Sequence, residues 1–305
     1  GIKAAGFKYI ELTATKGWTE HVFPDQSFRS LLRAQDMLDK YGLIPFAMSG
    51  HTNLMDTARI RDFVDNIRLA HFFGSEYIVS SIGEAHLEDK AVAPNSVVAE
   101  HIKGFAEYLE RYDMKLVLEV HGDHGTGRIL KEIVELVGSP RVLVNYDTAN
   151  AIFYGDVDVP EDFAACIDKI GYVHLKDKAG GHKEWNFPAL GKGYVEFPKL
   201  FKLMDDAHNM SPYSIEIEFT QAGAKDLAPL TTVMDAARLV DEDMRRLAME
   251  ARRLARTLRI TLYGTVAVMG LAVRAGWVGE PPGALAGVAS GWVIGVALAV
   301  YAVEF

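Results

Sequence analysis

The chain has 305 residues, of which 49% are hydrophobic and 24% are charged, a composition typical of a folded α/β protein. Its net charge of −9 argues against a broad nucleic-acid surface, and its single cysteine, Cys166, excludes an internal disulfide framework and a cysteine-rich metal site. The opening residues GIKAA lack the pattern of a signal peptide. We therefore expect a reduced, cytoplasmic protein that does not bind nucleic acid.

Short β-rich runs alternate with helical stretches over residues 1–244. The predicted strands are KYIEL (8–12), LIPFAMSGH (43–51), EYIVSS (76–81), KLVLEVHG (115–122), RVLVNYD (141–147), GYVHLKD (171–177) and YSIEIEF (213–219). Apolar residues at helical spacing predict helices over 26–41, 57–73, 95–112, 126–137 and 196–208. This alternation implies parallel strands joined by right-handed crossovers.

Seven predicted strands are one fewer than a (β/α)8 TIM barrel contains, and GIKAAGF at the start is typical of a helix end leading into a strand. We therefore expect an α/β fold of the TIM-barrel type that lacks its first strand. The alternative is an open, doubly wound sheet, which would gather polar residues at one switch point. Polar residues instead follow nearly every run, as they do where all strand ends share the mouth of one barrel.

Chemically reactive side chains stand near the ends of these runs. They are Glu11, His51, Glu84, Glu119, His121, Asp147, Asn150, His174, Lys176, Asp177, Glu216 and Glu218. A lone glutamate at such a position is usually solvated, and a lone aspartate is often a helix N-cap. These ordinary explanations become less convincing when they must apply to such residues on four successive strands.

Four of these residues, Glu119, Asp147, His174 and Glu216, lie on consecutive late strands and suit a divalent cation. Three carboxylates and one imidazole favour Mn²⁺ or Mg²⁺, with Co²⁺ and Zn²⁺ as alternatives. A bound cation would also reduce the cost of burying three carboxylates together. The sequence therefore predicts one metal site at the barrel mouth.

The motifs LEVHG, NYDTAN, VHLKD and SIEIEF, in this order and spacing, resemble the sugar isomerase/epimerase superfamily with the xylose isomerase-like barrel. The resemblance covers about residues 1–240 and extends to GFKYIEL, SGH and WNFPALGKGYVEFPKLFKLM. It implies one divalent metal on Glu119, Asp147, His174 and Glu216. It also implies that Glu119 and Glu216 flank the substrate as acid/base groups.

The motif SIEIEF offers two glutamates on one face of a strand, Glu216 and Glu218. We assign Glu216 to the metal and Glu218 to the substrate, because Glu119 and His121 have the same two-residue relation. Ketose 3-epimerases of this group often have His and Arg where this chain has Asn150 and Gly180, so a free-ketose 3-epimerase is less well supported.

Substrate contacts are expected from His51, His121, Asn150, Lys176 and Lys178 instead. Aromatic rings stack on the C–H faces of sugars, so Trp18 and Trp185, together with His21, are expected to wall the pocket.

The chemistry that this set supports is proton abstraction beside a carbonyl, with a metal ion stabilising an enediolate. Return of the proton would isomerise or epimerise a sugar, a sugar phosphate or a polyol. A dehydratase of the inosose or dehydroshikimate type begins with the same step. An endonuclease IV-like phosphoesterase needs more histidine ligands, and Asn150 stands where that enzyme has one. A barrel that does not close would leave an inactive fragment.

A second region begins near residue 245. The basic segment 245–259 precedes two apolar segments, 260–278 and 283–303, each close to the ~20 residues of a membrane-spanning helix. We therefore expect a barrel at 1–244 and a C-terminal hydrophobic helical hairpin at 245–305, whose arginines favour the cytoplasmic side. Such a hairpin would tether the barrel to the inner face of a membrane; the alternative is a tail without a biological role. A homo-oligomer is compatible with this interpretation.

Overall fold

Seven parallel strands curve around a common interior in the order β1-β3-β4-β5-β6-β7-β8. The computed structural model describes residues 2–15, 19–83 and 93–216. Its parallel strands are β1 (Tyr9–Thr15), β3 (Ile44–Ser49), β4 (Tyr77–Ser80), β5 (Lys115–Glu119), β6 (Val142–Asp147), β7 (Ile170–Leu175) and β8 (Tyr213–Ile215). A short strand, β2 (Thr19–Glu20), pairs antiparallel with β1 at one edge.

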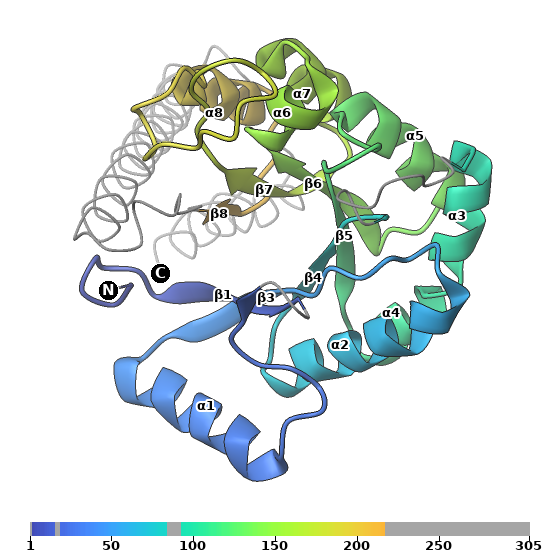
Figure 1. The fold of residues 1–305 in the computed structure, drawn as a ribbon, viewed down its shortest axis with the longest axis vertical. Helices are drawn as coiled ribbons and strands as arrows, with labels where there is room; N and C mark the ends of the chain where they lie inside the picture. The colour runs from blue at the N-terminus through green and yellow to red at the C-terminus, as the bar shows by residue number, and fades with distance from the viewer. Residues whose placement is uncertain (1, 16–18, 84–92, 217–305) are drawn as a thin grey trace, which may run out of the picture. The chain divides into compact units, whose positions relative to one another are not determined.

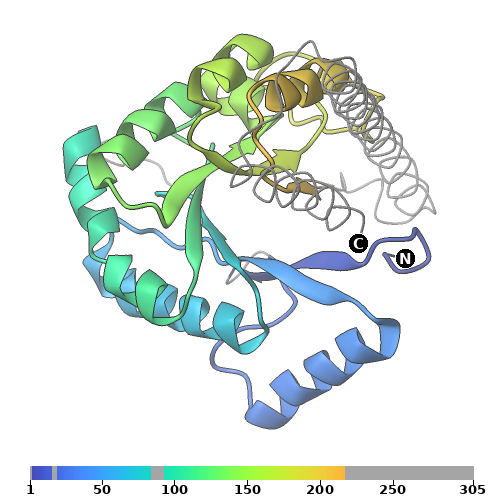
Figure 2. The same ribbon diagram turned by 180° about the vertical axis from the view of Figure 1, so that it is seen from behind.

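The helices cover the outside of this curved sheet (Figures 1 and 2). They are α1 (Phe28–Tyr41), α2 (Ile60–Phe72) with the 3-10 turn η1 (Thr57–Arg59) before it, α3 (Asn95–Lys103), α4 (Ala106–Arg111), α5 (Gly127–Val137), α6 (Asn150–Gly155), α7 (Val159–Cys166) and α8 (Phe197–Asp206). Among the described strands, β1 and β8 form the two ends of the parallel order. The fold is thus a nearly closed α/β barrel of the TIM type, and the prediction is confirmed in this form.

Local sequence signals set the ends of several helices. Ser27 and Thr126 begin α1 and α5, because each side-chain oxygen accepts a backbone N–H from the first turn. Gly42 and Gly138 end the same helices in the left-handed conformation. The single helix predicted over 95–112 is wrong in detail: it is divided into α3 and α4 at Gly104.

The two faces of each strand divide the core into two layers. Leu116 and Leu118 pack in the large cluster between the sheet and the helices. Val117 packs inside the barrel with a small cluster that includes Tyr77 and Tyr172. Because strand side chains alternate, Glu119 points to the same interior side as Val117. The barrel interior therefore changes from apolar to ionisable toward the carboxyl ends of its strands.

Every helix within the described residues is too short or too polar to cross a membrane. The predicted transmembrane segments, 260–278 and 283–303, lie outside those residues, as does the predicted boundary at 244/245. These assignments stay predictions.

Candidate metal and substrate site

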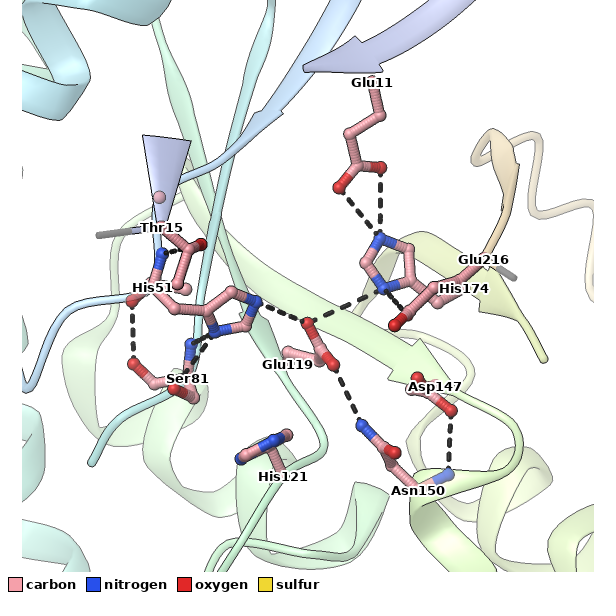
Figure 3. A network of polar contacts seen from close by, with 12 residues as sticks. Glu11, Thr15, His51, Ser81, Glu119, His121, Asp147, Asn150, His174 and Glu216 are labelled. Atoms are coloured by element: carbon pink, nitrogen blue, oxygen red, sulfur yellow. Dashed lines mark hydrogen bonds and ion pairs between the residues drawn. The ribbon is translucent and has the colours of Figure 1, made fainter. Parts of the chain in front are cut away.

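Four side chains from consecutive strands meet at one end of the barrel (Figure 3). Glu119 and Asp147 end β5 and β6, His174 lies on β7, and Glu216 directly follows β8. Each residue offers one ligand atom, and these four atoms all lie within 4.8 Å of one another. The structure therefore brings together the four residues that the sequence assigns to a metal.

One buried atom of each residue makes no aligned hydrogen bond. These atoms are Glu119 Oε2, Asp147 Oδ2, His174 Nδ1 and Glu216 Oε2. Each of these atoms instead faces an ionisable neighbour: Glu119 Oε2 lies 3.1 Å from His51 Nε2, His174 Nδ1 lies 3.0 Å from Glu216 Oε2, and Asp147 Oδ2 lies 3.7 Å from Lys176 Nζ. Four such atoms in one place, three carboxylate oxygens and one imidazole nitrogen, fit a divalent cation.

Burial and mutual repulsion disturb the protonation of this cluster. Burial raises the pKa of Asp147 well above its ordinary value, and the nearby Glu216 and Glu119 carboxylates add to the effect. Burial opposes the charge on His174, but Glu11 and Glu119 outweigh it and hold the pKa of that imidazole well above its ordinary range. A metal ion would have to displace protons from both residues.

We expect metal affinity to rise with pH for this reason. The raised pKa values mean that Asp147 and His174 retain protons to a higher pH in the metal-free protein. Each proton displaced changes the affinity by up to about tenfold per pH unit below the relevant pKa. Titration calorimetry of Mn²⁺ binding, in buffers of different ionisation enthalpy, measures the released protons directly. An affinity that does not change with pH would contradict this assignment.

Glu119 is buried, at 3% exposure, and has partners on both oxygens. Oε1 accepts a hydrogen bond from Asn150 Nδ2 at 2.9 Å, and Oε2 lies 3.1 Å from His51 Nε2. Burial alone would raise the pKa of Glu119, but His51 and His174 outweigh it and lower the pKa below its ordinary value. The carboxylate is therefore held in its charged form, as a metal ligand requires.

His51 faces Glu119 through a defined ring nitrogen. Its Nδ1 accepts the backbone N–H of Ser81 at 2.9 Å, and a backbone N–H can only donate. With Nδ1 acting as an acceptor, the ring N–H is on Nε2, the atom that faces Glu119. The predicted role of His51 in binding substrate stays a prediction, and Ser81 is a supporting residue that no sequence pattern indicated.

The two carboxylate oxygens of Asp147 have different roles: one holds the local backbone and the other faces the cluster. Oδ1 accepts the backbone N–H groups of Ala149 and Asn150 at 2.9 and 2.8 Å, which fixes the first turn of α6. Oδ2 is the atom left for the cation. The N-cap explanation for Asp147 is wrong in detail, because the N-cap of α6 is Ala149, but Oδ1 still holds the start of that helix while Oδ2 faces the site.

Glu11 on β1 holds the far side of His174. Its two carboxylate oxygens lie 3.2 and 3.1 Å from His174 Nε2, and Tyr172 donates its hydroxyl to Oε2 at 3.0 Å. This contact leaves Nδ1 facing the cluster and is the arrangement by which a carboxylate orients a metal-binding histidine. The only sequence signal for Glu11 was that it is an acidic residue within a predicted strand. That signal did not predict a role for it.

Replacing Glu11 by glutamine is expected to weaken Mn²⁺ binding by about 10–100-fold, because the amide no longer orients the His174 ring by charge. Tyr172→Phe, which removes only the hydrogen bond to Glu11, should have a smaller effect in the same direction. Glu110→Gln is the matched control, since its side chain is 80% exposed. Equal Mn²⁺ affinity in Glu11→Gln and the control would remove Glu11 from the site.

His121 follows Glu119 by two residues and lies beside a tyrosine. Its ring is 4.6 Å from that of Tyr154 and 5.9 Å from that of His51. Burial lowers the pKa of His121 to about 4, so the imidazole is neutral near pH 7. Tyr154 reaches this place because α6 approaches Gly125 closely: a Cβ on Gly155 would lie 2.2 Å from the Gly125 carbonyl oxygen.

The two lysines after β7 have different surroundings. Lys176 Nζ lies 3.1 Å from Glu216 Oε1 and 3.4 Å from Asn150 Oδ1, inside the site. Lys178 Nζ instead donates to the backbone carbonyls of Ala179 and Gly181. The expectation that Lys178 contacts substrate is therefore not supported, because its ammonium is engaged within its own loop.

The loop between β7 and α8 supplies an aromatic wall. The ring of Trp185, a residue 41% exposed, lies 5.2 Å from that of Phe153 and 4.9 Å from that of Phe187. Phe187 in turn lies over Lys176, with 4.7 Å between the ring centroid and Nζ. Trp185 is thus linked through Phe187 to Lys176 in the site, which is compatible with the prediction that it lines the pocket.

Asp177 anchors this loop from a buried position. Its carboxylate accepts the backbone N–H groups of Lys178 and Val195 on Oδ1, and those of Gly191 and Gly193 on Oδ2. A Cβ on Gly193 would lie 2.2 Å from the Lys178 carbonyl oxygen, so glycine is required there.

Three predicted pocket residues have not yet been placed: Trp18, His21 and Glu218. Trp18 and Glu218 lie outside the described residues. His21 accepts the backbone N–H of Thr13 through Nδ1, a contact with strand β1.

Comparison with known proteins decides the family. Residues 2–248 match the family described as "Xylose isomerase-like TIM barrel". The chain belongs to this family. Among curated proteins, this xylose isomerase-like barrel is similar to the putative L-ribulose-5-phosphate 3-epimerase SgbU of Escherichia coli K12, with 24% identity over 79% of this chain and 88% of the relative.

Solved structures share the barrel at low sequence identity. An L-ribulose 3-epimerase superposes with a TM-score of 0.63 at 18% identity, covering 83% of this chain and 89% of that one. The IOLI protein with a bound zinc atom gives 0.63 at 16%, over 78% and 89%. A probable 3-DHS dehydratase from Bacillus anthracis gives 0.59 at 16%, over 79% and 90%. At these identities the likeness shows the fold alone.

Proposed function

We propose that this xylose isomerase-like barrel is a metal-dependent isomerase or epimerase of a sugar, sugar phosphate or polyol. The observation that carries the proposal is the set of four buried atoms without aligned partners, which includes an oxygen from each of two glutamates. The curated relative named as a ribulose-5-phosphate 3-epimerase supports the same class of reaction.

Glu119, Asp147, His174 and Glu216 would hold the metal. Mn²⁺ and Mg²⁺ suit the oxygen-rich ligand set, with Co²⁺ and Zn²⁺ as alternatives; the zinc atom in the IOLI structure supports the latter. When bound, such an ion polarises the carbonyl and hydroxyl oxygens of a substrate.

Glu119 and Glu216 are the proposed acid/base residues. One carboxylate removes a proton from the carbon beside the carbonyl and leaves the substrate as an enediolate. Return of the proton to the former carbonyl carbon, with the neighbouring hydroxyl becoming the carbonyl, gives isomerisation. Delivery of a proton by the other carboxylate to the opposite face of the original carbon gives epimerisation. Positioned proton transfer of this kind typically contributes about 10²–10⁴-fold to the rate.

The substrate would lie between these carboxylates and the surrounding polar and aromatic side chains. The imidazoles of His51 and His121 are suited to hydrogen-bond its oxygens, and the Trp185 ring is suited to pack on its C–H face. Glu218 stays a predicted substrate contact, whereas Asn150 and Lys176, also predicted to bind substrate, contact Glu119 and Glu216 directly. A cytoplasmic location, a homo-oligomer and membrane contact through 260–303 stay predictions.

Deuterium exchange tests the proposal. The full chain is loaded with Mn²⁺, and ketoses, ketose phosphates, inososes and hydroxy acids are incubated with it in D₂O and followed by NMR. Deuterium entering at the carbon beside a carbonyl, together with an isomeric product, supports the isomerase or epimerase. Exchange followed by loss of water indicates a dehydratase of the inosose or dehydroshikimate type. Two or three bound zinc ions without exchange would favour an endonuclease IV-like phosphoesterase.

A further inference from the structure

A chain of three hydrogen bonds joins the two proposed acid/base glutamates. Asn150 Nδ2 donates to Glu119 Oε1 at 2.9 Å. Lys176 Nζ donates to Asn150 Oδ1 at 3.4 Å and to Glu216 Oε1 at 3.1 Å. The path Glu119–Asn150–Lys176–Glu216 therefore crosses from β5 to the end of β8 without a break.

The direction of every bond in this path is determined by its donors. An ammonium group can only donate, so the Asn150 oxygen must face Lys176. The amide nitrogen then faces Glu119, whose carboxylate can only accept. Asparagine at position 150 is thus matched to the lysine at 176, because its side chain both accepts and donates.

The hydrogen-bonded path ends on one carboxylate oxygen of each glutamate and does not involve the second oxygen. Oε1 of Glu119 and Oε1 of Glu216 receive its two ends. Oε2 of each glutamate is the buried atom without an aligned hydrogen bond, and these two oxygens lie 3.6 and 3.0 Å from His174 Nδ1 in the cluster. Fixing Oε1 of both residues therefore fixes which oxygens face the cation.

Burial makes these contacts strong. Asn150 is 3% exposed and Lys176 is 2% exposed, and Phe187 covers the ammonium group. Hydrogen bonds between buried groups are stronger than those in water, and networks of them act as units. Lys176 Nζ also lies 3.7 Å from Asp147 Oδ2, so its positive charge offsets part of the acidic cluster.

We propose that Asn150 and Lys176 act together as one positioning unit that aligns Glu119 and Glu216 toward the metal and the substrate. This inference rests on the proposed function, its binding part on the proposed metal site and its kinetic part on the proposed reaction. The two residues bind carboxylates of the protein, so their loss should disturb alignment more than substrate affinity.

A double-mutant cycle tests the unit. Asn150→Leu, Lys176→Met and the double variant are compared with the full-length protein for Mn²⁺ affinity by titration calorimetry. Each single change is expected to weaken Mn²⁺ binding by about tenfold or more, as loss of a residue supporting a ligand does. The double variant should be little weaker than the worse single variant, because either change breaks the whole path. Lys199→Met, on the exposed face of α8, is the control.

Kinetics add a readout that a purely structural role would not produce. With a substrate found by deuterium exchange, kcat should fall in all three variants while KM stays within about twofold, and Lys176→Arg should recover part of kcat. Additive losses of Mn²⁺ affinity, or a raised KM at unchanged kcat, would overturn the proposal and return these residues to separate substrate contacts.

The Mn²⁺ cycle remains informative even if no sugar is converted, so failure of the proposed function is distinguishable. If Asn150→Leu does not fold, Asn150→Asp replaces it; that change turns a donor into a second carboxylate facing Glu119 and should weaken Mn²⁺ binding more than tenfold. Unchanged Mn²⁺ affinity in Asn150→Asp would equally overturn the proposal.

Discussion

Glu119→Gln is expected to abolish retention of a divalent metal and to lower turnover by about 10²–10⁴-fold. The amide has the shape of the carboxylate but no charge, and one end of it must be a donor. That NH₂ group meets either Asn150 Nδ2, itself a donor, or the oxygen position that faces the cation. Both orientations damage the site.

Elemental analysis after dialysis measures the retained metal, and deuterium exchange measures proton abstraction. The control is again Glu110→Gln, whose exposed side chain lies away from the strand ends. A Glu119→Gln protein that keeps one equivalent of metal and exchanges deuterium at the normal rate would show that Glu119 is neither ligand nor base.

Asp177→Asn should have the largest effect on stability. The aspartate accepts two backbone N–H groups on each oxygen, so an amide NH₂ would confront two donors on one side. Each buried donor left unsatisfied costs about 1–3 kcal/mol, so we expect the free energy of unfolding to fall by about 2–4 kcal/mol.

The same change should loosen the loop that carries Trp185 and Phe187. Trypsin cleavage after Lys183 or Lys192 would then be faster, and kcat/KM would fall because the wall over Lys176 is no longer held. Asp206→Asn is a suitable control, because that carboxylate is 60% exposed and pairs only with Lys202 among the contacts described for it. Normal stability and normal protease resistance in Asp177→Asn would mean that other contacts hold the loop.

The barrel and the four clustered residues could be predicted because both depend on periodic patterns. Parallel strands place their carboxyl ends at one mouth, so residues at equivalent strand positions meet even when they are far apart in the chain. Alternation along β5 turned Glu119 inward, and the same rule applied to Asp147 and His174.

The contacts that support the four clustered residues could not be predicted, because they depend on tertiary packing and not on the periodicity of the sequence. Nothing in the sequence shows that the Ser81 backbone reaches His51, or that Lys178 turns back to its own loop carbonyls while Lys176 enters the site. The bridge through Asn150 needed the orientation of α6, which Asp147 and the close approach of Gly155 to Gly125 determine together.

The contact between Glu11 and His174 has a consequence for how the chain folds. These residues are 163 positions apart, and the proposed metal-binding set itself extends from Glu119 to Glu216. Contacts of such long sequence separation form late, because the entropy of closing a long loop must be overcome first. If the proposed metal binds there, a nascent chain could not capture it until almost the entire barrel had been synthesised, and metal uptake during refolding would report the final steps of assembly rather than the first.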